Sequence, residues 1–489
     1  MQQLQYIFCF LLFASFFFQA CRKEEFITDT GAKVEFSKDT LRFDTVFTQS
    51  GSATRFVKIK NRHNQPIKIA KIYLAKGDQS YFNLNIDGVS GDSQTDIEIP
   101  SGDSIYVFAE VTINPNDKNN PYIIDEELIV ETNGNVQKVI LEAWGQNANY
   151  IPDNMAKGKV VAMTSDQTWD DPKPYVIYGI LVIDACKLTI PAGARIHIHG
   201  GLVKEDKSIY SDGMIYVTRG GEIETQGTRT KPVIFQGDRL EKDFEKVPSQ
   251  WNLMYFGADT KANFNYTTIK NSRVGLYADS SSTIHLKYSQ IYNTAGPGII
   301  GRQSNITADN CLVHSNGDRS LLLVQGGRYN FTYSTIVNYG ASAAALEMSN
   351  AYCRAFDDKG NCISLATYPL IAQFDNSIIN SSQRDAMSFI PLQKEAFDYT
   401  FSNCIVKVEE LNKKGKGDII DFFEHCKDCI TIKSGDKLFK KIDMDNYHLD
   451  TLSIAENRAK PLPNFTEDLD GVARDAQKPD IGAFEFKPR

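Results

Sequence analysis

Residues 265–271 (NYTTIKN) recur in altered form as residues 287–293 (KYSQIYN) and 332–338 (TYSTIVN). Each copy places one apolar residue two positions after a small polar residue and two positions before an asparagine. Aligning the chain on that apolar residue gives a series of anchors: Ile269, Ile291, Leu312, Ile336, Ile378 and Ile405. The anchors are 22, 21, 24, 42 and 27 residues apart. Internal periods of about 20 to 50 residues are typical of solenoids, and we interpret the interval of 42 as two turns.

The repeated segments predict strands, because they are short, rich in β-branched residues and without the apolar spacing of helices. Coils stacked about 4.8 Å apart bring equivalent residues into columns along the axis. The series predicts a column of asparagines whose side-chain amides bond one another at a bend: Asn271, Asn293, Asn338 and Asn380. His314 and Lys407 interrupt this column. We therefore expect a parallel β-helix in this half of the chain.

A second column consists of tyrosines that stand three residues before the anchors: Tyr266, Tyr288 and Tyr333. If these side chains face outward, they form a platform on which sugar rings can stack. If they face inward, they belong to the core, which is favoured by Phe264 and Phe331 two residues earlier on the same side. Both alternatives stay open at this point.

Residues 34–147 show a different pattern, in which short alternating apolar runs are separated by turn residues. The spacing predicts seven to nine strands in a small immunoglobulin-like β-sandwich. Residues 148–159 are predicted to be a linker. The expected fold class is therefore all-β, with a sandwich followed by a β-helix.

Two resemblances extend this interpretation. The pieces VKIKNRHNQPIKIAKI (57–72) and IPSGDSIYVFAEVTINP (99–115) resemble Ig-like domains of the ASPM/SPD-2/hydin type. The series LTIPAG (188–193), GGEIETQGTRTKPVIF (220–235) and NYTTIKNS (265–272) resembles right-handed parallel β-helix proteins of pectate-lyase-like architecture, among them surface lipoproteins of Bacteroidota. The resemblance implies a β-helix over residues 160–430. Residues 431–489, which contain DLDGVARDAQKPDIGAFEF, resemble the closing segment of such proteins and imply a seal on the end of the solenoid.

The N-terminus resembles the signal sequence of a lipoprotein. Residues 6–18 (YIFCFLLFASFFF) form an apolar run too short for a membrane span and typical of a signal peptide, which we place at residues 1–20. Ala20-Cys21 resembles a lipobox, which implies lipid (palmitate) chains on Cys21 and a tether over residues 21–33. The residues after Cys21 resemble a surface-export signal, implying an outer-membrane protein on the cell surface. The alternatives are a cleaved secretory signal and an uncleaved anchor.

The cysteines predict at most a few cross-links. Cys353 and Cys362 bracket a polar loop and are candidates for a disulfide, and Cys426 is a candidate partner of Cys429 or of Cys404. A zinc site would need a second pair of ligands, so we expect no metal.

No catalytic cluster stands out in the sequence. Glycoside hydrolases need paired carboxylates, and lyases need a basic residue together with acidic residues that hold Ca²⁺. The aspartates that stand beside an arginine here are isolated from one another in the sequence: Asp238-Arg239, Asp318-Arg319 and Arg384-Asp385. Asp468 and Asp470 are expected to be structural. His197 and His199 are expected to face solvent, and His314 is expected at a hydrogen-bonded corner, with a Cys311–His314 dyad as the alternative. We predict no catalytic residue and no cofactor.

The composition limits the function classes. Hydrophobic residues make up 42% of the 489 residues, as in a folded protein, and the net charge of −8 argues against a nucleic-acid partner. The expected function is a lipid-anchored, non-catalytic β-helix that binds a glycan or an envelope protein. The alternative is a polysaccharide lyase or glycoside hydrolase acting on acidic glycans.

Overall fold

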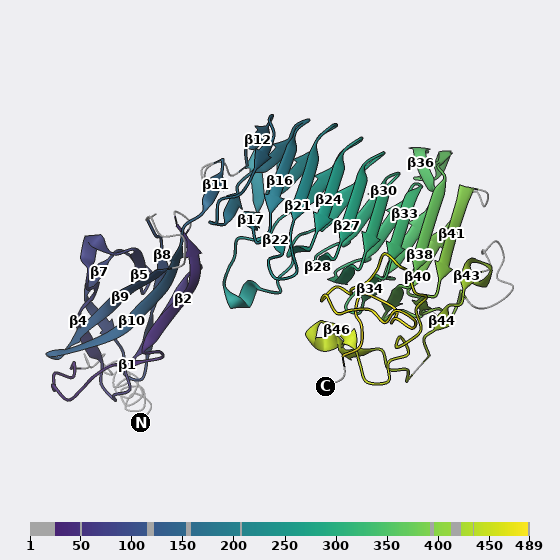
Figure 1. Ribbon diagram of the computed structural model, residues 1–489. Helices are drawn as coiled ribbons and strands as arrows, with labels where there is room; N and C mark the ends of the chain where they lie inside the picture. Colours follow the sequence, from purple (N-terminus) through teal and green to yellow (C-terminus); the bar gives the residue numbers. More distant parts are fainter. Residues whose placement is uncertain are drawn as a thin grey trace, which may run out of the picture. The chain divides into compact units, whose positions relative to one another are not determined.

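The computed structural model of the protein describes residues 25–48, 51–114, 122–152, 158–205, 208–391, 396–411, 422–433 and 435–487. The chain divides into two compact units, Met1–Asn147 and Ala148–Arg489 (Figure 1). The predicted signal peptide and the lipidation site Cys21 lie outside the described residues. Within the described ranges, no helix has the length and apolar character needed to cross a membrane.

The first unit is a β-sandwich of two five-stranded sheets. One sheet has the order β1 (Glu35–Phe36), β3 (Arg55–Lys60), β8 (Ser104–Val111), β5 (Phe82–Ile86), β6 (Val89–Ser90). The other has the order β2 (Thr40–Phe47), β10 (Asn135–Gln146), β9 (Tyr122–Thr132), β4 (Ile67–Leu74), β7 (Ser93–Ile99). Neighbouring strands are antiparallel except β2 and β10, which run parallel. The alternating pattern predicted from the sequence is thus confirmed as a sandwich.

The core of the sandwich lies between its two sheets, because alternate residues of each strand point to the same side. Phe43 of β2 and Phe82 of β5 meet there edge to face, with ring centres 5.4 Å apart, and both are buried. Burial of these rings and of the aliphatic residues around them holds the sheets together.

The second unit is a parallel β-helix, in which each coil adds one strand to each of three long sheets (Figure 1). The eleven-stranded sheet contains β11 (Asn149–Ile151), β14 (Tyr175–Ile177), β17 (Arg195–Ile198), β22 (Val233–Gly237), β25 (Thr267–Lys270), β28 (Gln290–Thr294), β31 (Leu312–Asn316), β34 (Thr335–Asn338), β39 (Ile378–Ser381), β42 (Ile405–Val406) and β44 (Ile430–Thr431). The nine-stranded sheet contains β12 (Val160–Met163), β15 (Ile180–Ile183), β20 (Met214–Val217), β23 (Met254–Phe256), β26 (Leu276–Ala278), β29 (Ile299–Arg302), β32 (Leu321–Val324), β35 (Leu346–Ser349) and β40 (Met387–Ile390). The ten-stranded sheet contains β13 (Gln167–Thr168), β16 (Lys187–Pro191), β21 (Glu222–Gln226), β24 (Lys261–Asn265), β27 (Thr283–Lys287), β30 (Asn305–Asp309), β33 (Gly327–Thr332), β38 (Leu370–Asp375), β41 (Phe397–Ser402) and β43 (Cys426–Lys427). The predicted all-β class is confirmed.

Like residues stack over like inside the solenoid. Phe331, Phe374 and Phe401 form one such inward column, with ring centres 5.1 and 4.7 Å apart and nearly parallel planes. Their strands β33, β38 and β41 pair in register. Each added coil therefore extends a continuous dry core.

The strand register corrects half of the predicted anchors. Ile269, Ile291 and Ile336 do point inward, but the residue level with Ile291 is Val313 and not Leu312. In the same way Ile379 and Val406, not Ile378 and Ile405, continue the column. Two adjacent apolar residues stand at each of these positions, so the sequence alone leaves the choice between opposite faces open.

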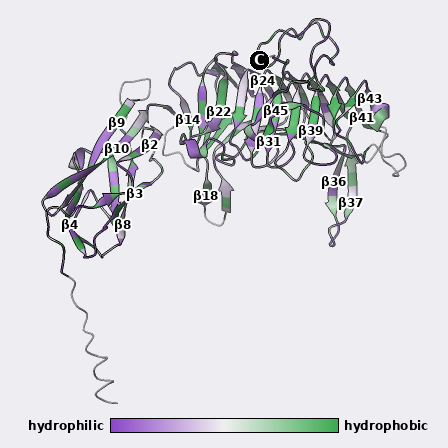
Figure 2. Cartoon of the chain, turned by 90° about the horizontal axis from the view of Figure 1, so that it is seen from below, coloured by the Kyte–Doolittle hydropathy of each residue, from purple (hydrophilic) through white to green (hydrophobic). Residues whose placement is uncertain are grey.

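Three shorter features interrupt or extend the coils. The interval of 42 residues is a single coil, because β34 pairs directly with β39; its extra length is the hairpin β36 (Ala351–Phe356) and β37 (Cys362–Thr367). A second hairpin, β18 (Leu202–Glu205) and β19 (Ser208–Ser211), also projects from the solenoid (Figure 2). Asn149–Ile151, predicted as linker, already form β11 and pair with β14.

The closing segment, residues 435–487, lies along the outside of the eleven-stranded sheet and not across the end of the solenoid. It contains the hairpin β45 (Phe439–Lys441) and β46 (Asn446–Leu449). Its apolar side chains cover outward-facing residues of the last coils: Leu312, Tyr333, Val337, Ile378 and Ile405. These residues account for the segment's place, because they would otherwise expose a wide apolar stripe to water.

Four 3₁₀-helices complete the described elements: η1 (Gly77–Gln79), η2 (Lys242–Phe244), η4 (Phe422–His425) and η5 (Ile442–Met444).

Candidate functional site: a tyrosine ladder on the nine-stranded sheet

The predicted tyrosine column is largely covered. Tyr266 and Tyr288 stack with ring centres 4.6 Å apart and are half-buried. Tyr333 is fully buried, and its hydroxyl donates to the carbonyl oxygen of Lys460 in the closing segment. The three tyrosines therefore mainly anchor the closing segment, which leaves little room for a sugar ring at this column.

The predicted asparagine column is shorter than expected and has no amide ladder. Asn271, Asn293 and Asn338 occupy equivalent positions, whereas Asn380 lies level with Val337, one residue out of register. The side-chain amide of Asn271 donates to the carbonyl oxygens of Glu245 and Val247, both at 3.0 Å. The Asn338 amide likewise donates to a backbone carbonyl oxygen, that of Asp318, whereas the amide nitrogen of Asn293 is buried without a hydrogen-bond partner among the described residues. These amides therefore do not bond one another.

The histidines differ from their predicted exposure. His197 is buried, and its Nδ1 lies 3.0 Å from the carbonyl oxygen of Gly237. Burial lowers the pKa of His197 to about 4. The residues 238–250 that follow β22 cover this part of the sheet, which the strand pattern alone could not reveal. His199 is half-buried, with Nδ1 2.6 Å from Asp238 Oδ2.

His314 is also buried. Its ring stacks on Tyr292 at 4.7 Å, and its Nδ1 lies 2.9 Å from Ser315 Oγ. The alternative dyad is not formed, because the Cys311 thiol donates to the carbonyl oxygen of Asp309 at 3.3 Å. Burial raises the pKa of Cys311 to about 12. His314 is therefore a buried, hydrogen-bonded residue on the outward side of β31.

The cysteines form one cross-link. Cys353 and Cys362 are joined by a disulfide in the hairpin β36–β37. Cys404, Cys426 and Cys429 are free thiols, so the pairings considered for them are absent.

The aspartate–arginine pairs noted in the sequence do not come together into one cluster of carboxylates. Asp318 and Glu347 share the guanidinium of Arg319, at 2.6 and 2.8 Å, and Asp468 accepts backbone N–H groups inside the closing segment. Among the residues that the structure describes, no group of three or more His, Cys, Asp or Glu side chains is placed to hold a metal ion.

Sequence reasoning missed an aromatic column on another face. Tyr216, Tyr255 and Tyr277 lie level with one another on β20, β23 and β26. Their ring centres are 4.9 and 5.0 Å apart, and all three are half-buried. We call this column the tyrosine ladder. Its signal was present in the sequence, because each tyrosine stands between two apolar residues whose side chains point inward.

The ladder lies in a longer apolar stripe on the outer face of the nine-stranded sheet. Val182 precedes Tyr216 in the register, and Ile300 and Leu322 follow Tyr277. A row of half-buried apolar and aromatic side chains therefore extends over consecutive coils.

An ion pair between Arg302 and the buried carboxylate of Asp279 fixes the middle of the ladder. Arg302 donates from Nε to Asp279 Oδ1 at 2.7 Å, and the hydroxyl of Tyr255 donates to Oδ2 of the same carboxylate. Burial and this hydrogen bond raise the pKa of Tyr255 far above its usual range. Burial also raises the pKa of Asp279, but the hydrogen bonds from Arg302 and Tyr255 outweigh it and the pKa falls below its ordinary value. Tyr255 is therefore held as a neutral phenol.

A pocket of about 230 Å³ lies elsewhere on the solenoid, between residues 238–250 and the closing segment. Its floor includes Lys270, Tyr292 and His314, and the ion pair Lys246–Asp445, 2.6 Å long, spans its rim. Burial lowers the pKa of Lys270, and no acceptor among the described residues bonds its amine. The pocket therefore contains a lysine amine, that of Lys270, which loses its proton more readily than the amine of an exposed lysine does.

Comparisons with known proteins agree with this fold. Residues 161–272 match the pectate-lyase like beta helix domain, and residues 252–356 match the right handed beta helix region. This part of the chain is therefore a right-handed β-helix of the pectate-lyase-like kind. No curated protein matches the chain.

Several solved structures are similar over parts of the chain. Pectate lyase Pel9A is 12% identical over 70% of this chain and 86% of its own, with a TM-score of 0.31. An ASH / PapD-like domain of human CEP192 is 13% identical over 26% and 95%, with a TM-score of 0.17. A protein of unknown function from Porphyromonas gingivalis W83 is 11% identical over 27% of this chain and 59% of its own, less than two thirds, with a TM-score of 0.18. At these values the likenesses carry no statement about substrate.

Proposed function

We propose that the protein is a lipid-anchored protein of the outer-membrane surface whose β-helix binds a glycan along the tyrosine ladder without cleaving it. The observation that carries the glycan site is the register of Tyr216, Tyr255 and Tyr277, which places three adjacent aromatic rings in a row on one outer face of the solenoid. Because the rings cover one another's faces, a glycan would lie along their outward edges, where apolar ring atoms contact sugar C–H groups and phenol hydroxyls can bind sugar hydroxyls.

Two features support a binding rather than a catalytic role for this face. The carboxylate that contacts the ladder, that of Asp279, is already bonded to Arg302 and Tyr255, whereas hydrolysis needs a pair of available carboxyl groups. The ion pair also holds the Tyr255 ring in one orientation, which reduces the entropy lost on binding.

Glycan binding is tested with the full-length protein and a panel of soluble polysaccharides in affinity electrophoresis and calorimetry. Tyr255→Ala and Tyr277→Ala should each weaken binding about tenfold, since each removes one ring from the contact surface and a tenfold change corresponds to about 1.4 kcal/mol. The control is Tyr352→Ala, an exposed tyrosine on the hairpin β36. Binding that survives loss of both ladder tyrosines would contradict the proposal.

The lipid anchor is a proposal that rests on the sequence around Cys21. Several acyl chains on one cysteine give stable membrane attachment. Cells producing the natural chain should incorporate a labelled palmitate precursor into the protein, and Cys21→Ala should abolish the label. Protease applied to intact cells should remove the protein if it faces outward, and protection from protease would exclude surface display.

One observation favours the second candidate function, a lyase or hydrolase of acidic glycans. The Lys270 amine lines the 230 Å³ pocket, and burial lowers its pKa, which brings the amine closer to the range of a general base. Assays for unsaturated products and new reducing ends, with Lys270→Met and the exposed Lys231→Met as control, distinguish the two functions. Product formation that depends on Lys270 would replace the non-catalytic proposal.

A further inference from the structure

The β-sandwich unit carries an exposed group of aromatic side chains. Phe56, Tyr106 and Phe108 are 43%, 39% and 37% exposed. Their ring centres lie 5.4 to 5.9 Å apart, and the rings of Tyr106 and Phe108 are nearly parallel, at 16°. We call these residues the aromatic triad. Single exposed apolar residues need no explanation, but three in mutual contact mark an interaction surface.

The triad follows from the position of β8 in its sheet. β8 lies between β3 and β5, and its residues alternate between buried and exposed. Ile105 and Val107 enter the core, so Tyr106 and Phe108 must point outward. Phe56 of β3 lies directly opposite Phe108. The triad therefore occupies the middle of the outer face of a sheet, with the amines of Lys38 and Lys58 over its Phe56 and Tyr106 rings and Phe108 lining the adjoining groove.

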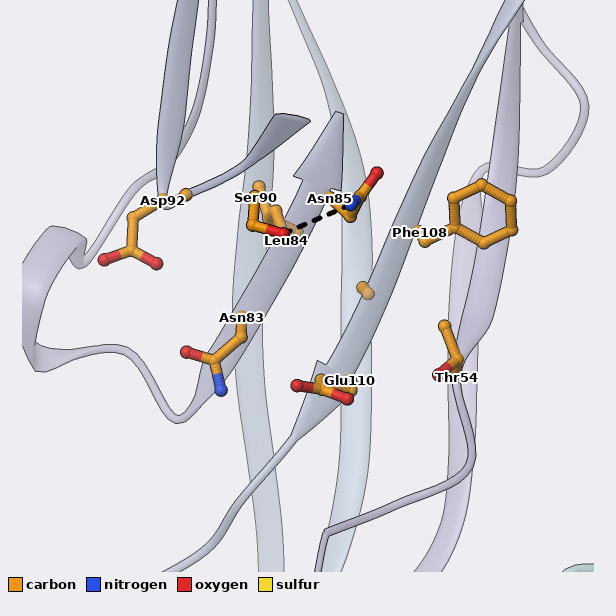
Figure 3. Close-up of a pocket in the computed structure, with 10 residues that line it drawn as sticks. Thr54, Asn83, Leu84, Asn85, Ser90, Asp92, Phe108 and Glu110 are labelled. Carbon is orange, nitrogen blue, oxygen red and sulfur yellow. Dashed lines mark hydrogen bonds between the residues drawn. The ribbon is translucent and has the colours of Figure 1, made fainter. Parts of the chain in front are cut away.

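A groove of about 540 Å³ begins at Phe108 and continues along the same face. Asn83 and Asn85 of β5 lie level with Glu110 and Phe108 of β8, and Asp92 lies on the far side (Figure 3). Among the described residues, the side chains of Asn83, Asp92 and Glu110 have no hydrogen-bond or ion-pair partner. The groove thus offers an amide and two carboxylates next to an aromatic surface.

We infer that this face of the sandwich binds a neutral saccharide chain, as a second glycan site separate from the tyrosine ladder. The sugar rings stack on the aromatic triad, and their hydroxyl groups donate to Asp92 and Glu110 and bond the amide of Asn83. Binding sites of this kind combine an apolar surface with a few polar groups that fix orientation.

The charge of the groove selects among possible occupants. Its lining contains two carboxylates and no lysine or arginine, so an acidic glycan or a phosphate-bearing ligand would be repelled. The amines of Lys38 and Lys58 lie over the Phe56 and Tyr106 rings, outside the groove lining. A second copy of the chain or another protein would use the triad but would have to desolvate two carboxylates in a groove whose own lining holds no cation. Hydroxyl groups satisfy carboxylates without adding charge, which favours a neutral saccharide.

The inference is tested with the full-length protein and purified neutral polysaccharides (mannan, xylan and a β-glucan), with polygalacturonate as the acidic comparison. Phe108→Ala and Glu110→Gln should each weaken binding of at least one neutral polysaccharide about tenfold. Tyr352→Ala serves as the matched control. Glu110→Gln keeps the size of an exposed side chain, so its loss of binding cannot be ascribed to unfolding.

The ladder variant Tyr255→Ala separates the two proposed sites. Binding that is lost in Phe108→Ala but kept in Tyr255→Ala supports the sandwich site, whatever the outcome at the ladder. If no neutral polysaccharide binds, or if Phe108→Ala binds as the natural chain does, the inference is overturned. A dimer in light scattering that Phe108→Ala dissociates would also overturn it, by assigning the triad to a contact between copies.

Discussion

The guanidinium of Arg474 lies 3.9 Å from the centre of the Tyr333 ring, and both side chains are buried. The same guanidinium donates to Glu485 Oε1 at 3.0 Å and to Asn310 Oδ1 at 2.7 Å. Tyr333 and Asn310 belong to neighbouring coils of the β-helix, whereas Arg474 and Glu485 belong to the closing segment. One arginine thus ties the closing segment to two coils.

Arg474→Ala should lower the free energy of unfolding by about 3 kcal/mol, because it leaves the Glu485 carboxyl buried without its cation. Arg474→Lys should recover only part of this loss, since an ammonium cannot reproduce the planar contact with Tyr333 and Asn310 together. Denaturant unfolding measures both. The exposed Arg458→Ala is the control, and equal stabilities for Arg474→Ala and Arg458→Ala would contradict the assigned role.

Acid should destabilise the β-helix through His197. Its pKa is about 4 in the folded chain, because burial disfavours the charged form, against an ordinary value of 6.5. The unfolded chain therefore binds the proton more readily, and the stability present above pH 6.5 is lost as the pH falls towards 4. The loss from this residue amounts to about 3 kcal/mol.

His197→Gln should reduce the slope of stability against pH between pH 6.5 and 4, as followed by thermal unfolding. His285→Gln, at an exposed position on β27, should leave the slope unchanged. An unaltered slope in His197→Gln would show that other groups dominate the acid response.

The carboxylate beside the tyrosine ladder should control the ionisation of Tyr255. Asp279→Asn removes a negative charge that opposes the phenolate, so the pKa of Tyr255 should fall towards its ordinary value, although burial keeps it above that value. Ultraviolet titration, with Tyr255→Phe subtracted to isolate this residue, measures the change. The idea fails if Asp279→Asn and the natural chain titrate alike at Tyr255.

Removal of the disulfide should loosen one hairpin and little else. The outward residues Phe356, Ile363 and Leu365 of β36–β37 are exposed, and a two-stranded hairpin is marginally stable by itself. The Cys353→Ser/Cys362→Ser variant should be cleaved faster within the hairpin in limited proteolysis. Its main unfolding transition should stay within about 2 °C of that of the natural chain, because the long sheets do not depend on the cross-link.

The repeat revealed the architecture because a coil must place an inward apolar residue at a regular interval. It did not reveal the register where two apolar residues adjoin, as at Leu312 and Val313. There one residue enters the core and the other contacts the closing segment. The second partner lies more than a hundred residues away in the chain, so nothing local indicates which residue takes which role.

The candidate sites were harder to predict for a related reason. The asparagine repeat marks one strand of each coil, whereas Tyr216, Tyr255 and Tyr277 belong to another strand. Their positions in the chain, 39 and 22 residues apart, differ because residues 238–250 are inserted in one coil. In the sandwich, Phe56 and Phe108 become neighbours only through the antiparallel pairing of β3 with β8.

The lateral course of the closing segment has a consequence for biogenesis. Arg229, in an early coil, donates to the carbonyl oxygens of Asp470 and Gly471, so the flank of the solenoid is wrapped by residues made more than two hundred positions later. Until those residues have been synthesised, the nascent chain exposes an apolar surface to water that includes Ile378 and Ile405. We expect such a chain to need chaperone protection until the closing segment has been made. Variants truncated before residue 435 should aggregate, although every coil is present.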